Sequence, residues 1–108
     1  MRGEALKGHL DMLVLAAVQA RPAHGYAVIE ELRRLSGGAF DLPEGTVYPA
    51  LHRLERAGLL ASAWSTEAPR RRRVYRLTER GRAALAEAER DWRRFSQGVA
   101  AVLAARPA

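Results

Sequence analysis

The chain contains no cysteine, and this absence removes several classes of function. Without thiols the protein has no disulfide framework, no thiolate metal site, and no cysteine that could act as a nucleophile or redox sensor. This composition fits a cytoplasmic location. The sequence therefore points away from small disulfide-rich and redox-active proteins.

Long apolar runs and catalytic signatures are missing too. The longest apolar stretch, residues 12–18, is far too short to span a bilayer, and polar residues lie where a signal peptide would continue. The three histidines share no spacing typical of metal ligands, and we find no glycine-rich phosphate loop or nucleophile with an evident base. We expect no membrane partner, no metal or other cofactor, and no enzyme activity.

Lysine is almost absent, so the positive charge is carried by arginine. Lys7 is the single lysine in a chain of 108 residues with a formal net charge of +6. This balance favours a polyanionic partner, and the planar guanidinium suits phosphates and guanine edges. A bias toward alanine and arginine can also reflect a GC-rich genome. A single domain this short gains stability from a partner subunit, so its size is compatible with a dimer.

Apolar periodicity predicts two helices in the first third of the chain. The first covers residues 6–20, is apolar on more than one side, and ends before Pro22. The second begins near Gly25 and stops at residues 36–38, Ser-Gly-Gly. Its inward residues are expected to be Tyr26, Ile29 and Leu32.

A third helix is predicted to run to about residue 57. Asp41 is placed to cap its free amides. Pro49 would delete a hydrogen bond inside an established helix, so a start nearer residues 45–46 is the alternative. The sequence leaves this start open.

The pattern then changes from helical to extended. Residues 60–65 and 73–77 read as two strands of a hairpin with four arginines, residues 70–73, at its tip. Thr78 is expected to cap a last helix that continues to about residue 105.

The last helix carries an apolar seam at heptad spacing. The hairpin separates this helix from the first three, so we expect a second copy of the chain to cover the seam in a two-fold dimer. The seam consists of Leu85, Ala88, Trp92, Phe95, Val99 and Val102.

The predicted fold is mainly α with a small β-hairpin. Residues 1–77 form a winged helix-turn-helix DNA-binding domain, and residues 78–108 form a long C-terminal dimerisation helix. In its residues the chain resembles the PadR family, over about nine-tenths of its length. The matching segments are LKGHLDMLVL (6–15), HGY (24–26), GTVYPALHRLE (45–55), GLL (58–60) and YRLT (75–78).

This resemblance implies a cytoplasmic, dimeric transcription factor. Members of the family are usually repressors that a small molecule releases from DNA, and the length is similar to the subgroup with a single C-terminal helix. Some members use a tryptophan of the last helix to bind an effector at the dimer interface, and Trp92 stands at that place. Trp92 and Phe95 therefore either fill the interface or line a pocket for a flat aromatic effector.

A helical wheel over residues 46–57 indicates a recognition helix. Val47, Ala50, Leu51 and Leu54 point inward. The amino-terminal end would enter the major groove, although an ordinary solvated face is the alternative. The candidate DNA-binding residues are Thr46, Tyr48, Pro49, His52, Arg53 and Arg56.

The hairpin arginines complete the predicted interface. A charge run by itself is more often a solvated segment, but beside a recognition helix arginines can reach the adjacent minor groove or its phosphates. We favour Arg70, Arg71 and Arg72, because Arg73 can already belong to the returning strand. His24 and Trp64 are expected to be structural.

Rival functions remain open at this stage, because fold alone does not fix function. One is a winged-helix module that binds proteins, and another is a protein that sequesters aromatic ligands through Trp92. A nonspecific nucleoid protein is the third. DNA titrations with alanine variants of Arg53, Arg71 and Trp92 separate these possibilities.

Overall fold

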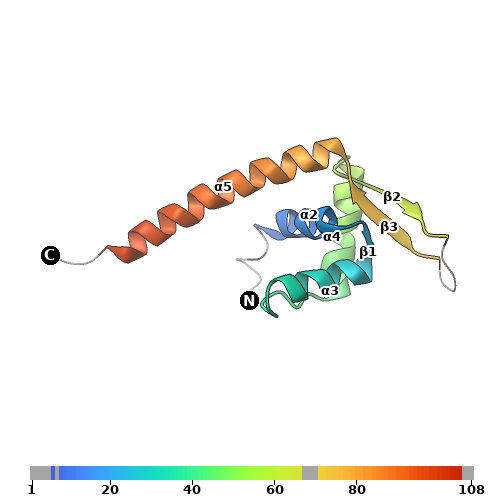
Figure 1. Ribbon diagram of the computed structural model, residues 1–108, viewed down its shortest axis with the longest axis horizontal. Coiled ribbons are helices and arrows are strands. Elements are labelled where there is room, and N and C mark those ends of the chain that lie inside the picture. Colours follow the sequence, from blue (N-terminus) through green and yellow to red (C-terminus); the bar gives the residue numbers. More distant parts are fainter. Residues whose placement is uncertain (1–5, 7, 67–70, 106–108) are drawn as a thin grey trace.

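The computed structural model describes residues 6, 8–66 and 71–105, and helices dominate it (Figure 1). This confirms the predicted fold class, with a sheet that has one more strand than expected. The elements are α2 (Leu10–Ala20), β1 (Ala23–His24), α3 (Gly25–Leu35), α4 (Glu44–Arg56), β2 (Leu60–Trp64), β3 (Arg73–Leu77) and α5 (Glu79–Ala104).

Helix α2 is the most buried of the helices. Residues 14, 15, 17 and 18 are buried, which agrees with the prediction of a helix that is apolar on more than one side. Its C-terminal end is also as predicted, since Arg21 is extended and Pro22 follows. The N-terminal end differs from the predicted start at residue 6, because Gly8 and His9 form a turn and the helix begins at Leu10.

Helix α3 corrects one predicted core residue. Ile29 and Leu32 are buried as expected, but Tyr26 is 54% exposed, so the prediction that it points inward was wrong. The buried face is centred on Gly25 and Val28. Successive residues of a helix are about 100° apart, which places Tyr26 on the flank of this face.

Helix α4 begins at Glu44, with Pro43 in extended conformation as its N-cap residue. The prediction that Asp41 caps the helix was wrong, because the first turn starts two residues too late for its side chain. The Pro43 carbonyl instead accepts hydrogen bonds from the amides of residues 46 and 47, at 3.0 and 3.2 Å. Pro49 lies inside the helix; it and Gly45 are exposed, so water can reach the carbonyl that Pro49 cannot bond.

The sheet is antiparallel, in the order β1-β3-β2. Strands β2 and β3 form the predicted hairpin, with Leu60 opposite Leu77 and Trp64 opposite Arg73. The sequence reading missed β1, which has two residues and pairs with β3 through Ala23 and His24. The candidate Arg70 lies outside the described residues.

Thr78 joins the hairpin to the last helix. Its Oγ1 atom accepts a hydrogen bond from the Gly81 amide at 3.0 Å, which confirms the predicted cap. The same hydroxyl donates to the Gly58 carbonyl at 2.7 Å, where Gly58 ends the turn after α4 with a φ of +80°. One side chain thus fixes the direction of α5 relative to α4.

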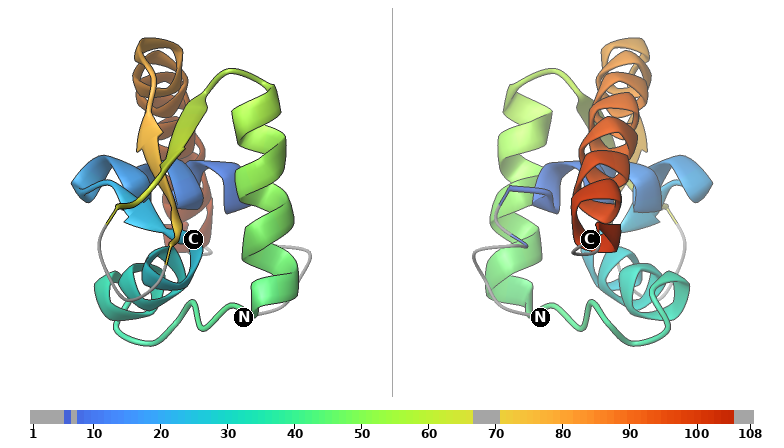
Figure 2. Two further views of the ribbon diagram at one scale, coloured as in Figure 1. Left: turned by 90° about the vertical axis from the view of Figure 1, so that its right-hand side faces the viewer. Right: turned by 90° about the vertical axis from the view of Figure 1, so that its left-hand side faces the viewer.

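Helix α5 packs on α2 at its start and then leaves the rest of the molecule (Figures 1 and 2). Leu85 is 6% exposed and belongs to the core. Trp92 lies edge-to-face against His9 of the turn before α2, with 4.9 Å between ring centroids. The expectation that no earlier helix covers the seam was therefore wrong for its first half, whereas Val99 and Val102, beyond Phe95, are exposed.

Candidate nucleic-acid interface

Helix α4 has one buried and one exposed face, as the helical wheel predicted. The four residues expected to point inward are all buried, and Val47, Ala50 and Leu51 have no exposed surface. The side chains of the opposite face are exposed or partly exposed along the length of the helix. Pro49, His52, Arg53 and Arg56 are exposed there, and Thr46 and Tyr48 are partly buried.

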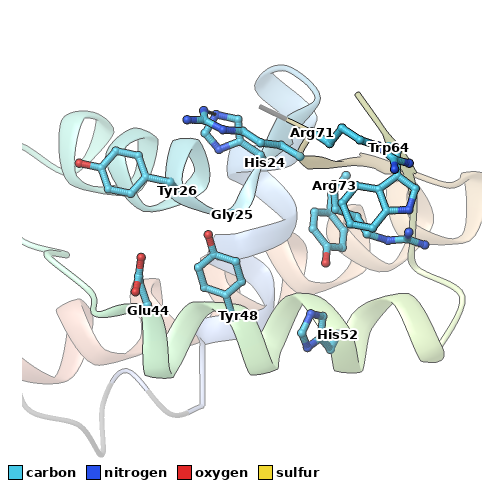
Figure 3. A pocket seen from close by; sticks show the side chains of 11 residues that line it. His24, Gly25, Tyr26, Glu44, Tyr48, His52, Trp64, Arg71 and Arg73 are labelled. Carbon is cyan, nitrogen blue, oxygen red and sulfur yellow. Dashed lines mark hydrogen bonds between the residues drawn. The ribbon is translucent and has the colours of Figure 1, made fainter. Parts of the chain in front are cut away.

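A cleft of about 590 Å³ separates α4 from the β2–β3 hairpin, which we call the wing (Figure 3). Its floor and walls combine aromatic rings with imidazole and guanidinium groups. Tyr48 and His52 enter it from α4, and Arg71, Arg72 and Arg73 from the wing. The other lining residues are His24, Gly25, Tyr26, Glu44, Trp64 and Tyr75.

Tyr48 is held in this cleft by its contact with α3. A Cβ atom on Gly25 would lie 2.5 Å from the Cε1 and Cζ atoms of the Tyr48 ring, so the ring occupies the space that a side chain would fill. This explains why glycine stands at position 25 beside an aromatic residue at position 48. Figure 3 shows the Tyr48 ring extending from α4 toward Gly25 of α3.

Two of the three described wing arginines lie over the same tryptophan ring, and the third contacts His24. The guanidinium carbon of Arg71 lies over the Trp64 ring, 4.9 Å from its centroid. Nη1 of Arg72 lies 2.7 Å from Nε2 of His24. Arg73 also lies over Trp64, at 5.2 Å, and its Nε donates to the Ser62 hydroxyl at 2.8 Å.

Arg73 is further connected to α4. Its Nη2 lies 4.0 Å from Oε2 of Glu55, and the Ser62 hydroxyl donates to the same carboxylate at 2.6 Å. The charge of Arg73 is therefore partly compensated by Glu55, and one of its donors is occupied by Ser62. The sequence had excluded Arg73 from the favoured DNA-binding set because of its place in the strand, but gave no sign of the Glu55 and Ser62 partners.

His24 has two roles that compete for one ring. Nδ1 accepts a hydrogen bond from the Ala27 amide at 3.2 Å and so caps α3, as its expected structural role implied. A neutral imidazole has one acceptor nitrogen, so the ring cannot cap α3 and accept from Arg72 at the same time. Burial first, and then the positive charge of Arg72, lower the pKa of His24 from its usual value.

Arg53 and Arg56 differ in whether an acidic side chain pairs with them. The guanidinium of Arg53 makes an ion pair with the Asp11 carboxylate of α2, and both side chains are half exposed. Arg56 has no ion pair with any residue that the structure describes. The sequence had no signal for the Asp11 contact, because the two residues are 42 positions apart.

The seam residues fall into two groups. Leu85 is buried in the core and Ala88 is partly buried, whereas Phe95 is 61% and Val102 is 74% exposed. A groove of about 440 Å³ follows the outer half of α5, lined by Phe95, Val99 and Val102. A smaller hollow of about 290 Å³ lies beside Trp92, between α5 and the turn before α2.

The described residues, 6, 8–66 and 71–105, contain neither a candidate metal site nor a candidate membrane span. In this part of the chain no cluster of three or more histidine, aspartate or glutamate side chains could hold a metal ion. No helix within it is both long and apolar enough to cross a membrane.

The arrangement of three helices followed by a wing defines a winged helix-turn-helix protein. A family model described as "Transcriptional regulator PadR-like family" matches residues 14–87. The chain belongs to this family of transcriptional regulators, which confirms the resemblance seen in the sequence.

Related proteins agree with this assignment. The chain is 48% identical to "Transcriptional regulator Rv3488" of Mycobacterium tuberculosis over 76 residues, which cover 70% of this chain and 68% of the relative. It is similar to the crystal structure of a PadR family transcriptional regulator from Eggerthella lenta, with 36% identity and a TM-score of 0.81. That match covers 95% of this chain and 88% of the other.

A second crystal structure supports the fold alone. The PadR-like transcriptional regulator from Bacillus cereus superposes with a TM-score of 0.84, covering 96% of this chain and all of the other, at 24% identity. The backbone arrangement is therefore retained where most side chains differ.

Proposed function

We propose that this protein regulates transcription by binding double-stranded DNA with α4 in the major groove and the wing against the neighbouring backbone or minor groove. The observation that supports this is the single cleft that α4 shares with the wing, lined on both sides by donors. DNA presents alternating grooves and phosphate strands, and a helix and a hairpin side by side match that spacing.

The residues divide the work by position. Thr46, Tyr48 and Pro49 lie toward the amino-terminal end of α4, where recognition helices meet base edges and phosphates. His52 and Arg56 follow at helical spacing on the exposed side. Arg53, Arg70, Arg71 and Arg72 add positive charge, which supplies most of the affinity for the phosphate backbone.

The protein works as a homodimer in this proposal. Large apolar side chains on the outer half of α5 are exposed, although monomeric proteins rarely expose a continuous apolar stripe. A second copy aligned on the same stripe would bury it in both chains. In this proposal residues 1–77 are the DNA-binding unit and residues 78–108 are the dimerisation segment. Within that segment the contact between the two copies begins at Trp92.

Regulation would follow from the same helix. We propose a repressor that a flat aromatic molecule releases by binding beside Trp92, in the hollow between α5 and His9. A ligand there changes how α5 leaves the domain and hence the separation of the two recognition helices, which must match about 34 Å of DNA. Because its target is the chromosome, we place the protein in the cytoplasm.

Fluorescence anisotropy with the protein's own promoter and a scrambled duplex, at several salt concentrations, tests the function. We expect selective binding with a steep salt dependence, and a loss for Arg56→Ala that exceeds the loss for Arg90→Ala. Both variants remove one exposed charge, but Arg56 lies on α4 and Arg90 on α5.

Each other result points elsewhere. Equal and weak binding to both duplexes would contradict the hypothesis that the protein regulates its own promoter, and would favour a nonspecific nucleoid role. No binding to any duplex would contradict DNA binding altogether, in favour of a protein-binding module or, if aromatic ligands still bind, a sequestering protein.

A further inference from the structure

Trp64 is a large aromatic residue on an exposed part of the wing. It is the last residue of β2 and is 52% exposed, in the wall of the cleft. An exposed indole adds little to a hydrophobic core. Its position is instead related to the two guanidinium groups that lie over its ring, those of Arg71 and Arg73.

The two arginines are held in different ways. Arg73 stands opposite Trp64 in the strand register and also contacts Ser62 and Glu55, so it has polar partners from both β2 and α4. For Arg71, the contact that the structure describes is the Trp64 ring. Arg71 precedes β3, which begins at Arg73, so Arg71 lies outside the residue pairs of the β2–β3 ladder.

A contact through the ring face leaves the donors of an arginine free. The cation–π attraction acts between the π-face and the guanidinium charge, whereas the N–H donors lie in the guanidinium plane and point outward. In an ion pair with a carboxylate, by contrast, the charge of an arginine is compensated and its donors are occupied by that partner. Stacking on tryptophan therefore restricts the side chain while keeping it able to bind a phosphate.

We propose that Trp64 is a positioning residue for DNA binding, which holds the Arg71 guanidinium at the rim of the cleft with its donors available to a backbone phosphate. The inference rests on the proposed function and adds a division of labour to it. Arg71 contacts DNA, and Arg73 ties the wing to α4 through Glu55.

The physical gain is a smaller ordering cost. A free arginine loses much of its rotamer freedom when it binds, and a side chain already held near its bound position loses less. The contribution of Trp64 thus depends on Arg71 and disappears when Arg71 is absent. A tryptophan that only stabilises the wing would contribute whether or not Arg71 is present.

A double-mutant cycle separates these two roles. Trp64→Leu, Arg71→Ala and the double variant are titrated by anisotropy with a labelled mixed-sequence duplex at low salt, so that no operator has to be known. We expect Trp64→Leu to weaken binding about fivefold in the wild-type background and less than about 1.5-fold in the Arg71→Ala background. Trp64→Phe, which keeps an aromatic face, restores part of the loss.

Arg76→Ala serves as the matched control. Arg76 is exposed on β3, on the face of the strand opposite to Arg73 and Tyr75, and is not among the residues that line the cleft. The effects of Trp64→Leu and Arg76→Ala are expected to multiply, since these residues do not act together.

The outcomes distinguish the inference from the function. If the wild-type protein binds the duplex and the losses from Trp64→Leu and Arg71→Ala multiply, Trp64 is structural and the inference is overturned. A melting temperature that falls in Trp64→Leu as affinity falls, with no rescue by Trp64→Phe, overturns it as well. If the wild-type protein binds no duplex, the proposed function fails first.

Discussion

The ring of Tyr48 packs over Gly25, so α4 and α3 meet at a position without a side chain. A Cβ atom at Gly25 would lie 2.5 Å from two ring carbons of Tyr48. The ring is partly exposed and can rotate, so the overlap can be relieved by moving Tyr48. This contact therefore couples residue 25 to the face of α4 that we propose to bind DNA.

Gly25→Ala is expected to impair DNA binding more than folding. Displacing Tyr48 costs about 1 kcal/mol of stability and removes its hydroxyl from the cleft. In a Tyr48→Ala background the same change has no overlap to relieve, and Ala in place of Gly favours the helix. Thermal melts and anisotropy on both backgrounds check this. Equal losses of DNA affinity in the two backgrounds would contradict the coupling.

Gly81 makes a closer approach that cannot be relieved in this way. A Cβ atom there would overlap the carbonyl oxygen of Leu59, a backbone atom fixed at the turn before β2. Gly81→Ala is expected to lower the free energy of unfolding by about 3 kcal/mol, as in an overpacked core.

Gly98→Ala is the control on the same helix. No residue that the structure describes lies within 4 Å of a Cβ atom at Gly98, so this substitution is expected to stabilise α5 by up to about 1 kcal/mol. Chemical denaturation measures both variants. Similar destabilisation by both would show that α5 is sensitive to any side chain, and would contradict the steric explanation at Gly81.

His24 predicts a dependence of stability on pH. Its folded pKa is lowered from 6.5, so the unfolded chain binds a proton more readily than the folded protein. Unfolding is therefore favoured as the pH falls through 6.5 toward the lower folded value, and this part of the stability is fully present at neutral pH. His24→Asn keeps a cap acceptor without a titrating ring.

The comparison needs two pH values and one control. Urea midpoints at about pH 7.5 and about pH 5.5 are expected to differ less in His24→Asn than in the wild type. His52→Asn, at an exposed position on α4, is expected to retain the wild-type difference. An unchanged difference in His24→Asn would rule out His24 as the titrating group.

Local patterns predicted much of the fold. The inward face of α4 and the Thr78 cap depend on residues three or four positions apart, and both are as the sequence indicated. Asp41 failed as a cap because Pro43 already sets an extended conformation before α4. Tyr26 was wrongly predicted to point inward, because the buried face of α3 is centred on Gly25 and Val28 and Tyr26 lies beside it.

The candidate site was predicted less completely, for a physical reason. Its residue types on α4 and the wing could be found from charge and helical spacing. Strand β1, the Arg72–His24 contact and the Arg53–Asp11 pair join segments far apart in the chain. Such pairs are set by tertiary packing, and no single-sequence period records them.

The Arg53–Asp11 pair provides the last prediction. A half-exposed pair contributes little to stability, so Asp11→Asn should leave the melting temperature nearly unchanged. The substitution releases Arg53 from its ion pair and removes a negative charge beside α4. We expect affinity for a mixed-sequence duplex to rise about threefold at low salt, with a steeper dependence on salt concentration.

The direction of this change identifies what Asp11 does. Glu87→Gln removes the same charge from an exposed position on α5 and controls for the net charge of the protein. A larger gain in Asp11→Asn than in Glu87→Gln means that Asp11 restrains Arg53 from binding phosphates. A loss of affinity would instead mean that Asp11 holds Arg53 in its DNA-binding position, and would contradict a competition between the Asp11 carboxylate and DNA phosphates for Arg53.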